Sequence, residues 1–344
     1  MDLRDQKFGL EIEMTGISRD YAAEVISKHF NTRSSFIGGT YRQYQVRDRE
    51  GRIWKVMWDS SITPQKKIQN HRVRTNEDHA VEVVSPICRY EDIKEIQQIV
   101  RKLRKAGGFV NQSCGIHVHV DASKHDARSL RNIINIIYSK EDLIFKTLQV
   151  DERRKNRFCK EVDDSFLKKV NAKKPKTKEA FARLWYEGNM DRRLTHYDSS
   201  RYHTLNLHSV FQKGTVEFRM FNSTLHAGMV KTYIQFSLAI SAQAINQRKA
   251  SRIKTVSTNE RYTFRTWLLR LGMKGDEFAT ARKLLLKNLE GNIAWKDPAQ
   301  AEAQKERLKA KSEEQRQLSS SSVIAQTEEV SEEMQPGIMS MHQR

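Results

Sequence analysis

The sequence predicts an α+β protein in which helices pack on the apolar face of a mostly antiparallel sheet. Three observations lead to this fold class. Four separate segments alternate apolar and polar residues with a period of two, as half-buried strands do. The longer segments between them repeat apolar residues every three or four positions, as helices on a core do. Two pairs of strand segments flank turn residues, which predicts antiparallel hairpins.

The first strand is predicted at Phe8 to Met14. Its apolar residues face one way, and Glu11 and Glu13 share the opposite face. Asp20 to Phe30 follows with the spacing of a short amphipathic helix. The chain therefore begins with a strand that offers two carboxylates on its polar side.

A hairpin is predicted next, with strands at Tyr41 to Arg47 and Ile53 to Trp58. Asp59 comes directly after the second strand. Pro64 to Asp78 is polar, basic and without periodicity, which indicates a loop. Glu82 is then the one ionisable residue of a further strand, which a proline closes.

A helix is predicted between Ile93 and Leu103, where a pair of glycines follows its last turn. Cys114 to Asp121 is a strand in which His117 and His119 share one face, opposite an apolar row. Ser129 to Leu148 continues as a long helix with an apolar face. The face of this strand that carries His117 and His119 is therefore expected to contact polar groups or a ligand.

Two basic segments follow. The arginines of Arg153 to Cys159 suit phosphate or carboxylate, but cations near a helix end also occur without a ligand. Lys168 to Lys178 indicates an exposed linker. Arg201 to His208 and Thr215 to Phe221 then predict a second hairpin, whose last strand carries a glutamate and an arginine on one face.

The last apolar helix is predicted at Ala227 to Gln247. We expect one folded domain over residues 1–295, with a C-terminal helical cap at about 261–295. Residues 296–344 form a polar tail, which is expected to be helical around Asp297 to Gln317 and disordered beyond it.

Charge and cysteine content restrict the function classes. The chain has 344 residues and a formal net charge of +19, and the tail holds 7 Lys and Arg against 9 Asp and Glu. The folded part is thus the basic part, which favours a polyanionic partner or substrate, although such residues also solvate helix faces. Three cysteines without metal-ligand spacing and the lack of an apolar leader predict a cytoplasmic protein with no membrane partner.

If these strands belong to one sheet, its polar face gathers four carboxylates, two imidazoles and a guanidinium. Like charges at that density repel by on the order of several kcal/mol when partly buried, so a divalent cation is expected among them. Carboxylates with few imidazoles suit Mg²⁺ or Mn²⁺, whereas zinc prefers more histidine or thiolate. Each motif alone also fits a solvated face or a surface ion pair. Their joint occurrence with one parity on four strands indicates a site.

The order of these segments resembles the amidoligase family, which is similar in fold to glutamine synthetase and glutamate–cysteine ligase. The resemblance runs from Phe8 to about Trp295 and leaves out the tail. The segments that carry it are Phe8 to Glu13, Asp59 to Ile62, Glu82 to Pro86, Cys114 to Asp121, Arg153, Arg154 and Asn156, Arg201-Tyr202 with Leu205 to Leu207, Thr215 to Arg219 with Thr224-Leu225, and Asn292 to Trp295.

The resemblance implies an amidoligase-like catalytic domain at residues 1–295, with a glutamine-synthetase-like sheet. It also implies an ATP-dependent carboxylate–amine ligase that uses Mg²⁺ or Mn²⁺. A carboxylate would attack the γ-phosphate of ATP, and an amine would displace phosphate from the resulting acyl phosphate. The substrates would be a small-molecule or peptide carboxylate and an amine acceptor, joined by an amide or isopeptide bond.

The same resemblance assigns roles to residues of this chain. The ligands of the metal nearest the γ-phosphate would be Glu11, His117 and Glu217. Those of the second metal would be Glu13 and Glu82, with Asp59 as a candidate to complete the site. The catalytic set would be Arg219, which stabilises the transferring phosphoryl group, with Glu217 and Glu13. The contacts to nucleotide or substrate would be His119, Arg201, Asn206, Arg153, Arg154 and Asp59.

Three other function classes stay open. A metal-dependent hydrolase would use His117 and His119 as zinc ligands with Glu82 as base, and would turn over without ATP. A nucleic-acid-binding protein, which we do not favour, would use the basic body and bind less tightly as salt rises. A catalytically inactive scaffold would bind nucleotide weakly or not at all.

Overall fold

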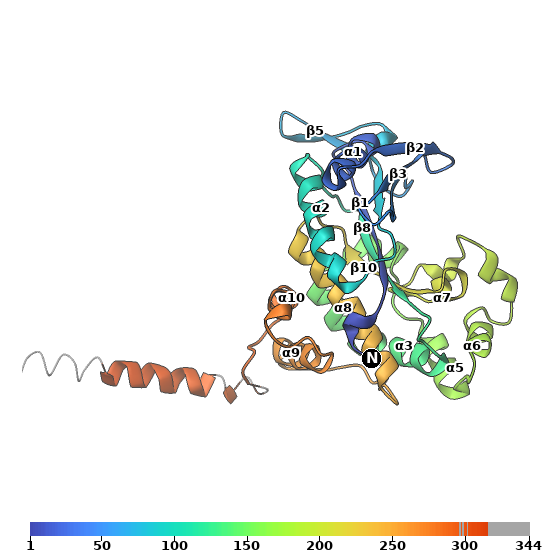
Figure 1. The fold of residues 1–344 in the computed structure, drawn as a ribbon. Coiled ribbons are helices and arrows are strands. Elements are labelled where there is room, and N and C mark those ends of the chain that lie inside the picture. Colours follow the sequence, from blue (N-terminus) through green and yellow to red (C-terminus); the bar gives the residue numbers. More distant parts are fainter. Residues whose placement is uncertain (296, 298, 301, 316–344) are drawn as a thin grey trace, which may run out of the picture. The chain divides into compact units, whose positions relative to one another are not determined.

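Eight strands form one sheet in the computed structural model, which describes residues 1–295, 297, 299, 300 and 302–315 (Figure 1). Neighbouring strands are antiparallel, in the order β2-β3-β4-β7-β1-β8-β10-β9. The strands are β1 (Phe8–Met14), β2 (Ser34–Gly38), β3 (Gln43–Arg47), β4 (Ile53–Met57), β7 (Val81–Val84), β8 (Gly115–Asp121), β9 (Leu205–Asn206) and β10 (Thr215–Asn222). The predicted α+β class with a mostly antiparallel sheet is confirmed.

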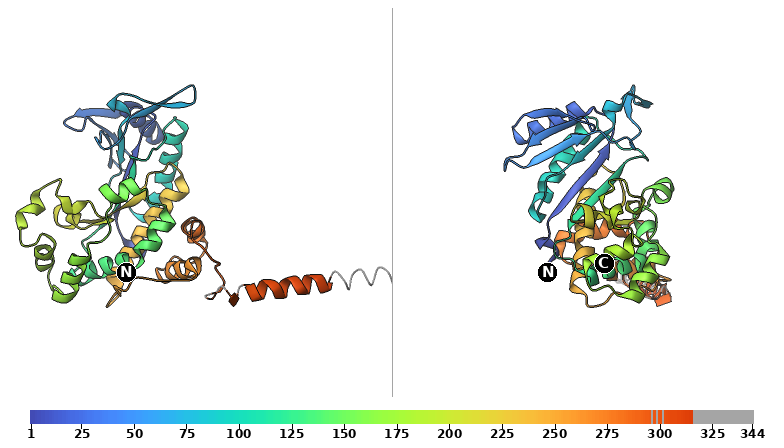
Figure 2. Two further views of the ribbon diagram at one scale, coloured as in Figure 1. Left: turned by 180° about the vertical axis from the view of Figure 1, so that it is seen from behind. Right: turned by 90° about the vertical axis from the view of Figure 1, so that its right-hand side faces the viewer.

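Helices cover the apolar face of this sheet, where α1, α2, α3 and α8 contact the strands or one another (Figures 1 and 2). The α-helices are α1 (Arg19–Phe30), α2 (Ile93–Lys105), α3 (Ala127–Leu148), α4 (Glu152–Arg157), α5 (Asp164–Lys173), α6 (Lys178–Trp185), α7 (His208–Gln212), α8 (Ala227–Asn246), α9 (Glu260–Arg270) and α10 (Ala279–Leu286). The short 3₁₀ helices are η1 (Leu3–Asp5), η2 (Glu77–His79), η3 (Tyr90–Asp92), η4 (Met190–Leu194), η5 (Ser199–Arg201) and η6 (Asp276–Phe278).

The period-two pattern explains which face of the sheet is buried against these helices. The apolar side chains of β1, β8 and β10 lie in the core and are at most 2% exposed: Phe8, Leu10, Ile12, Met14, Ile116, Val118, Val120, Val216, Phe218 and Met220. Burial of this apolar row fixes the register, because a slip of one residue would turn every core side chain to the other face. The polar residues of the same strands are therefore held together on the opposite face.

The helix ends follow local sequence signals. Asp126 caps α3 by accepting a hydrogen bond from the Ser129 N–H. After α2 the chain turns at Gly107, whose φ of 101° favours glycine. α2 then contacts α8, and α1 contacts β3, so both N-terminal helices pack on the core side.

The segment from Pro64 to Asp78 corrects a prediction. It is not a loop: β5 (Gln65–Ile68) and β6 (His71–Arg74) pair as a separate two-stranded hairpin. Its turn residues Gln69 and Asn70 both have positive φ, as primed hairpin turns require, but neither is the glycine that usually marks such a turn. The hairpin carries basic side chains beside the main sheet.

Two further predictions were wrong in part. Lys168 to Lys178 is not a linker over its whole length, because α5 extends to Lys173. Arg201 to His208 contributes only the two residues of β9, and α7 intervenes before β10. The short strand still pairs with β10, so the predicted antiparallel neighbours are present.

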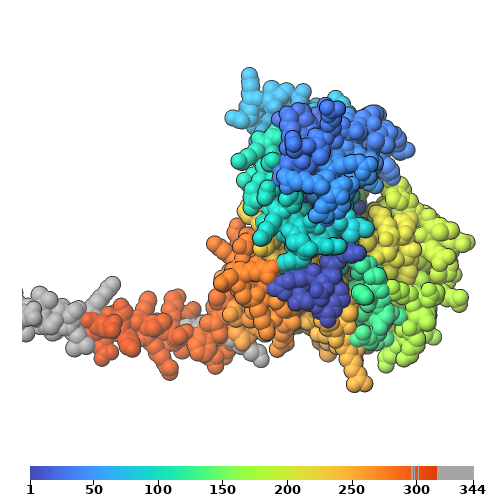
Figure 3. Space-filling view, viewed as in Figure 1, coloured from blue at the N-terminus to red at the C-terminus, as the bar shows by residue number. Residues whose placement is uncertain are grey.

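The insertion between α3 and β10 contains α4 to α7. The hydroxyl of Tyr197 in this insertion lies 2.9 Å from that of Tyr41, which precedes β3. Figure 3 shows the corresponding blue and yellow-green regions next to each other. The segment before β3 and the insertion before β10 thus contact each other through these two tyrosines.

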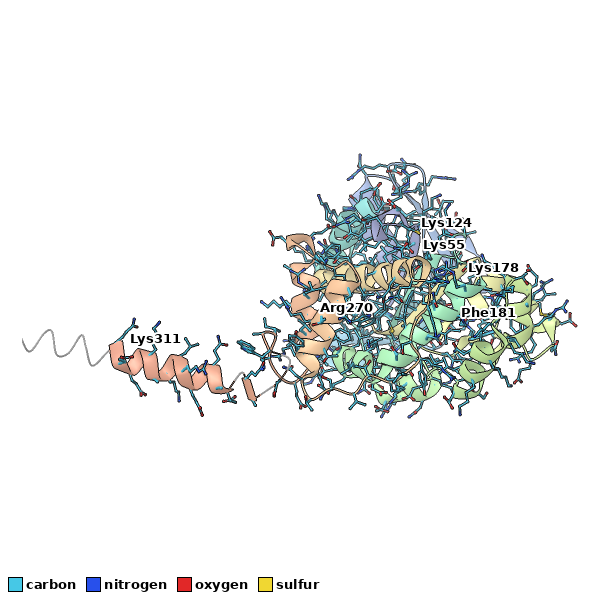
Figure 4. The ribbon with its side chains drawn as sticks, turned by 90° about the horizontal axis from the view of Figure 1, so that it is seen from below. Lys55, Lys124, Lys178, Phe181, Arg270 and Lys311 are labelled. Carbon is cyan, nitrogen blue, oxygen red and sulfur yellow. The ribbon has the colours of Figure 1, made fainter. Side chains whose placement is uncertain are left out.

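The described C-terminal part contains α9, α10 and a further helical segment. Residues 1–257 and 264–289 form one compact unit, and residues 258–263 with the described residues from 290 onward form a second. Residues 302–315 are helical, and Lys311 projects from that helix in Figure 4. The predicted disorder beyond Gln317 lies outside the described residues, and the boundary at 295 stays a prediction. None of the described helices is both long and apolar enough to span a bilayer.

Candidate functional site

A row of polar side chains crosses the sheet on the face opposite the core. It comes from β7, β1, β8, β10 and β9, which are adjacent in this order. The cross-strand partners are Glu82 with Glu13, Glu11 with His117, His119 with Glu217, and Glu217 with Asn206. We call these seven side chains, together with Arg219 of β10, the polar row.

The two histidines lie on either side of Glu11. Oε2 of Glu11 is 2.9 Å from Nδ1 of His117, and Oε1 is 3.0 Å from Nε2 of His119. Nδ1 of His119 lies 3.1 Å from the hydroxyl of Thr215. Within the described residues, the buried Nε2 atoms of both rings have no hydrogen bond of good geometry. Buried polar atoms without such a partner are rare, so both Nε2 atoms are candidate ligand atoms, although that of His119 also lies beside the Glu11 carboxylate.

Glu217 is held from two sides. The Asn206 amide donates to its Oε2 at 2.6 Å, and Arg219 forms an ion pair with Oε1. Arg219 also donates from Nε to the Phe158 carbonyl at 3.3 Å, which fixes its guanidinium against the insertion. Burial opposes ionisation of Glu217, but Arg219 and His119 hold the pKa of Glu217 below its ordinary value.

Glu11 and the two histidines shift one another's pKa values. Burial alone would raise the pKa of Glu11, but His119 and His117 lower the pKa of Glu11 well below its usual range. Burial works against a charged His119, yet the carboxylates of Glu11 and Glu217 raise the pKa of His119. Burial and then Arg219 lower the pKa of His117 to about 4, so this ring is neutral at pH 7 and can act as a metal ligand.

Two other carboxylates resist ionisation. Burial, followed by repulsion from Glu11, Asp59 and Glu13, raises the pKa of Glu82 well above its ordinary value. Burial also raises the pKa of Glu13 to about 7, although Arg154 opposes this shift. Carboxylates that are forced together in this way favour a bound cation, because it removes the repulsion between them.

Three sets of side chains on this face can each offer ligand atoms that lie within 4.8 Å of one another. The sets are Glu11, His119 and Glu217; Glu11, Glu82 and His117; and Glu13, Asp59 and Glu82. Each set has two or three carboxylates and at most one imidazole, which suits a hard divalent ion. The residues therefore fit Mg²⁺ or Mn²⁺. Among the described residues, one set groups Glu217 with Glu11 and His119. His117, which the resemblance implies as the ligand beside Glu217, has its Nδ1 3.8 Å from Glu217 Oε1, and this ligand set stays a prediction.

Asp59 reaches the row from the end of β4. Its Oδ1 accepts a hydrogen bond from the Ser61 N–H at 2.6 Å, which fixes the turn that follows the strand. Its inclusion with Glu13 and Glu82 supports the expectation that it can complete a second ion site.

Arg154 is buried at the Glu13 end of the row. The Gly115 N–H donates to Glu13 Oε2 at 2.6 Å, and a Cβ on Gly115 would lie 2.3 Å from a guanidinium nitrogen of Arg154. Only glycine therefore leaves room for Arg154 at this position. Arg153, one residue earlier, lies at the surface of an adjacent pocket of about 830 Å³.

Arg201 is not placed in the polar row. It donates to the His196 carbonyl at 3.1 Å, and its guanidinium lies 5.4 Å from the centre of the Tyr197 ring. It belongs instead to the segment that carries the tyrosine contact with Tyr41. A direct role at the row stays a prediction.

Sequence reasoning missed several groups near the row. Thr215 binds His119, and Lys213 Nζ lies 3.9 Å from Glu11 Oε1. Thr215 shares the parity of Glu217 on its strand, so the alternating pattern could have found it. The basic segment that contains Arg72 and Arg74 suggested an acidic carboxylate substrate from the sequence, but the pattern could not place these two arginines, because the segment containing β6 was predicted as a loop.

The comparison with protein families agrees with the resemblance in the sequence. A family model described as "Putative amidoligase enzyme" matches residues 4–241. A solved structure, the bifunctional glutathione synthetase from Pasteurella multocida, aligns with a TM-score of 0.37 and 11% identity, over 83% of this chain and 47% of that chain. This chain thus spans about half the length of that protein. A comparison with curated proteins gave no match.

Proposed function

This chain belongs to the amidoligase family, and we propose that it is an ATP-dependent carboxylate–amine ligase that forms an amide or isopeptide bond. The observation that supports this proposal most strongly is the polar row, in which carboxylates and imidazoles of neighbouring strands converge on one buried face. Apolar residues in place of buried charged groups are often neutral or stabilising, so four carboxylates gathered on one face favour a functional use.

The proposed reaction has two steps. An oxygen of the substrate carboxylate attacks the γ-phosphorus of ATP, and the bond to the bridging oxygen breaks to release ADP. The amine nitrogen then attacks the carbonyl carbon of the acyl phosphate, the carbon–oxygen bond to phosphate breaks, and the amine loses one proton. The base that accepts this proton is unassigned.

In this proposal the acids and histidines of the polar row hold divalent ions. Such ions would neutralise the triphosphate and the charge that develops on the transferring group. Arg219 supplies a fixed positive charge beside Glu217, because burial and the ion pair leave it little freedom to move. Asn206 positions Glu217 by its hydrogen bond and keeps one carboxylate oxygen aimed into the row.

In this proposal the nucleotide phosphates bind beside Glu11, and the nearby His119 and Lys213 support this position. Both lie within 4 Å of Glu11, and the Lys213 ammonium is partly exposed. The opposite end, at Glu13 and Glu82, would then receive the carboxylate that is to be activated.

The proposed substrates are a small-molecule or peptide carboxylate and an amine. The three cysteines of the described chain are all free thiols, which supports our proposal of a cytoplasmic location. Nucleic acid remains an unfavoured alternative, since the basic surface can equally serve acidic substrates.

The experiment uses the purified full-length protein with Mg²⁺, ATP and a cell extract. Mass spectrometry should find a product lighter by one water than the sum of two metabolites or peptides, together with ADP and phosphate. Glu217→Gln should abolish both, and Glu91→Gln, at an exposed position, should retain them. Turnover without ATP, or activity that requires zinc, would contradict the ligase and favour a hydrolase.

A further inference from the structure

A pocket with an unusual excess of arginine opens beside the Glu13 end of the polar row. It measures about 830 Å³. Its guanidinium groups come from β6 and from α4: Arg72, Arg74, Arg153, Arg154 and Arg157. We call it the arginine pocket. Asp151 is the one acidic side chain among its described lining residues, and it accepts a hydrogen bond from the Arg153 N–H.

None of these arginines forms an ion pair within the described residues, although Arg154 lies near enough to Glu13 to lower the pKa of that carboxyl. Within the described part of the chain, no acidic side chain lies within ion-pair distance of any of the five. Arg154 is 2% exposed, and its Nε has no hydrogen-bond partner among the described residues. Unpaired cations gathered in this way raise the local positive potential and attract an anion.

Several guanidiniums are held in place before any ligand arrives. Arg72 stacks over the Phe109 ring at 4.7 Å and donates to the Val110 carbonyl at 3.3 Å. Arg157 stacks over the Phe158 ring at 5.0 Å. Arginine fixed by an aromatic face presents its planar fork in a defined direction, which suits the bidentate binding of carboxylates.

The inner wall of the pocket is shared with the polar row. Ser61 lines the pocket and binds Asp59 through its N–H. Cys114 also lines it, and the next residue, Gly115, donates its N–H to Glu13. A ligand in the pocket therefore lies beside the carboxylates of Glu13 and Asp59, and farther from Glu11.

We propose that the arginine pocket binds a substrate with several carboxylates, of the kind that an acidic peptide presents, and holds one of them at the polar row as the donor. This inference rests on the proposed ligase function, since it names the carboxylate substrate of the same site. Five guanidiniums exceed what one carboxylate can pair, and the volume is in the range of pockets that take extended small ligands rather than single ions.

Binding of triglutamate, measured by titration calorimetry without ATP, tests this proposal. Triglutamine is the neutral probe of the same length. Triglutamate should bind more tightly by roughly tenfold or more, and Arg72→Gln and Arg157→Gln should each weaken it several-fold. Both arginines are exposed, so the variants should fold. Arg101→Gln, at an exposed position of α2, is the matched control and should bind as the original protein does.

Equal affinity for the two peptides, or no effect of either pocket variant, would overturn the proposal. A second titration with Mg²⁺ and ATP separates the two anionic ligands. If Arg72→Gln and Arg157→Gln weaken ATP binding and leave triglutamate unchanged, the pocket holds nucleotide phosphates and the proposal is wrong. Triglutamate binding that depends on these arginines, in a protein that never hydrolyses ATP, would support the pocket and contradict the ligase.

Discussion

Glu82 and Glu13 are the two carboxyls of the polar row whose ionisation is unfavourable. Burial and neighbouring carboxylates raise the pKa of Glu82, and burial raises the pKa of Glu13 to about 7. Glu11 and Glu217 stay ionised because histidines and Arg219 stand beside them. The row thus contains more acid than its own cations can neutralise, which is a feature of sites that bind metal at the expense of stability.

Glu82→Gln should separate these two effects. Without metal, the variant should be more stable than the original protein by about 1 to 2 kcal/mol, because a repelled buried carboxyl is replaced by a neutral amide. Its affinity for Mn²⁺, followed by electron paramagnetic resonance, should fall at least about tenfold. Glu91→Gln is the exposed control. A variant that binds Mn²⁺ normally would remove Glu82 from the ion site.

The raised pKa of Glu141 should make the stability of the protein depend on pH. It is buried in α3, where Oε1 accepts a hydrogen bond from the Val162 N–H at 2.9 Å, and burial raises the pKa of Glu141 to about 7. The unfolded chain releases this proton nearer pH 4.5. Between these values the native protein binds more protons than the unfolded chain, so this group lowers stability as pH rises through that window.

Glu141→Gln should therefore gain stability relative to the original protein as pH increases. The difference in the free energy of unfolding between the two should grow by on the order of 2 to 3 kcal/mol from pH 4.5 to pH 7.5. Urea unfolding at several pH values measures it. Glu179→Gln, at an exposed position of α6, should show little change. A pH-independent difference for Glu141→Gln would contradict a proton held in the native state.

At the scale of elements, the close approach of α4 to β8 depends on one residue. A Cβ at Gly115 would meet the guanidinium of Arg154, whose terminal nitrogen donates to the Arg219 carbonyl at 3.2 Å. Gly115→Ala should displace Arg154 and lower stability by about 1 to 3 kcal/mol.

Gly9 of β1 provides the comparison. A Cβ there would lie 3.8 Å from Cβ of His119, an ordinary contact. Gly9→Ala should leave the thermal unfolding midpoint unchanged or higher, because alanine costs less backbone entropy in a strand than glycine. If both variants unfold at the same temperature, Arg154 is not wedged against β8 as described here.

The elements also show what sequence reasoning can and cannot reach. Alternation placed Glu11 with Glu13 and His117 with His119 on one face, because burial of the other face permits a single register. It could not align Glu217 with His119, because alternation gives the face on which a residue lies but not the offset of one strand against the next by two residues.

The sequence marks the two arginine-bearing segments as basic, but it could not show that they line one pocket, for a different reason. Arg72 and Arg157 are far apart in the chain, and they lie on one pocket only because a hairpin and a short helix meet there. The hairpin was missed because Gln69 and Asn70 adopt left-handed backbone angles without glycine. Local patterns carry no information on such tertiary contacts.

At the scale of the whole molecule, the sheet and the tail are expected to be independent. The family model ends at residue 241, and the described tail residues belong to the smaller compact unit. A chain ending at Trp295 keeps the hydrogen bond from Asn259 to the Trp295 carbonyl. It should retain ATP hydrolysis, and its unfolding midpoint should stay within about 2 °C of the full chain. A loss of activity would assign the tail to the catalytic unit.

The central claim is that the polar row binds divalent ions together with a nucleotide triphosphate. Crystals grown with Mn²⁺ and a non-hydrolysable ATP analogue test it most directly, because manganese is located by its anomalous scattering. The account predicts manganese among Glu11, Glu82, His117, His119 and Glu217, with the γ-phosphate beside Arg219. Manganese and nucleotide bound elsewhere, with the row unoccupied under these conditions, would contradict it.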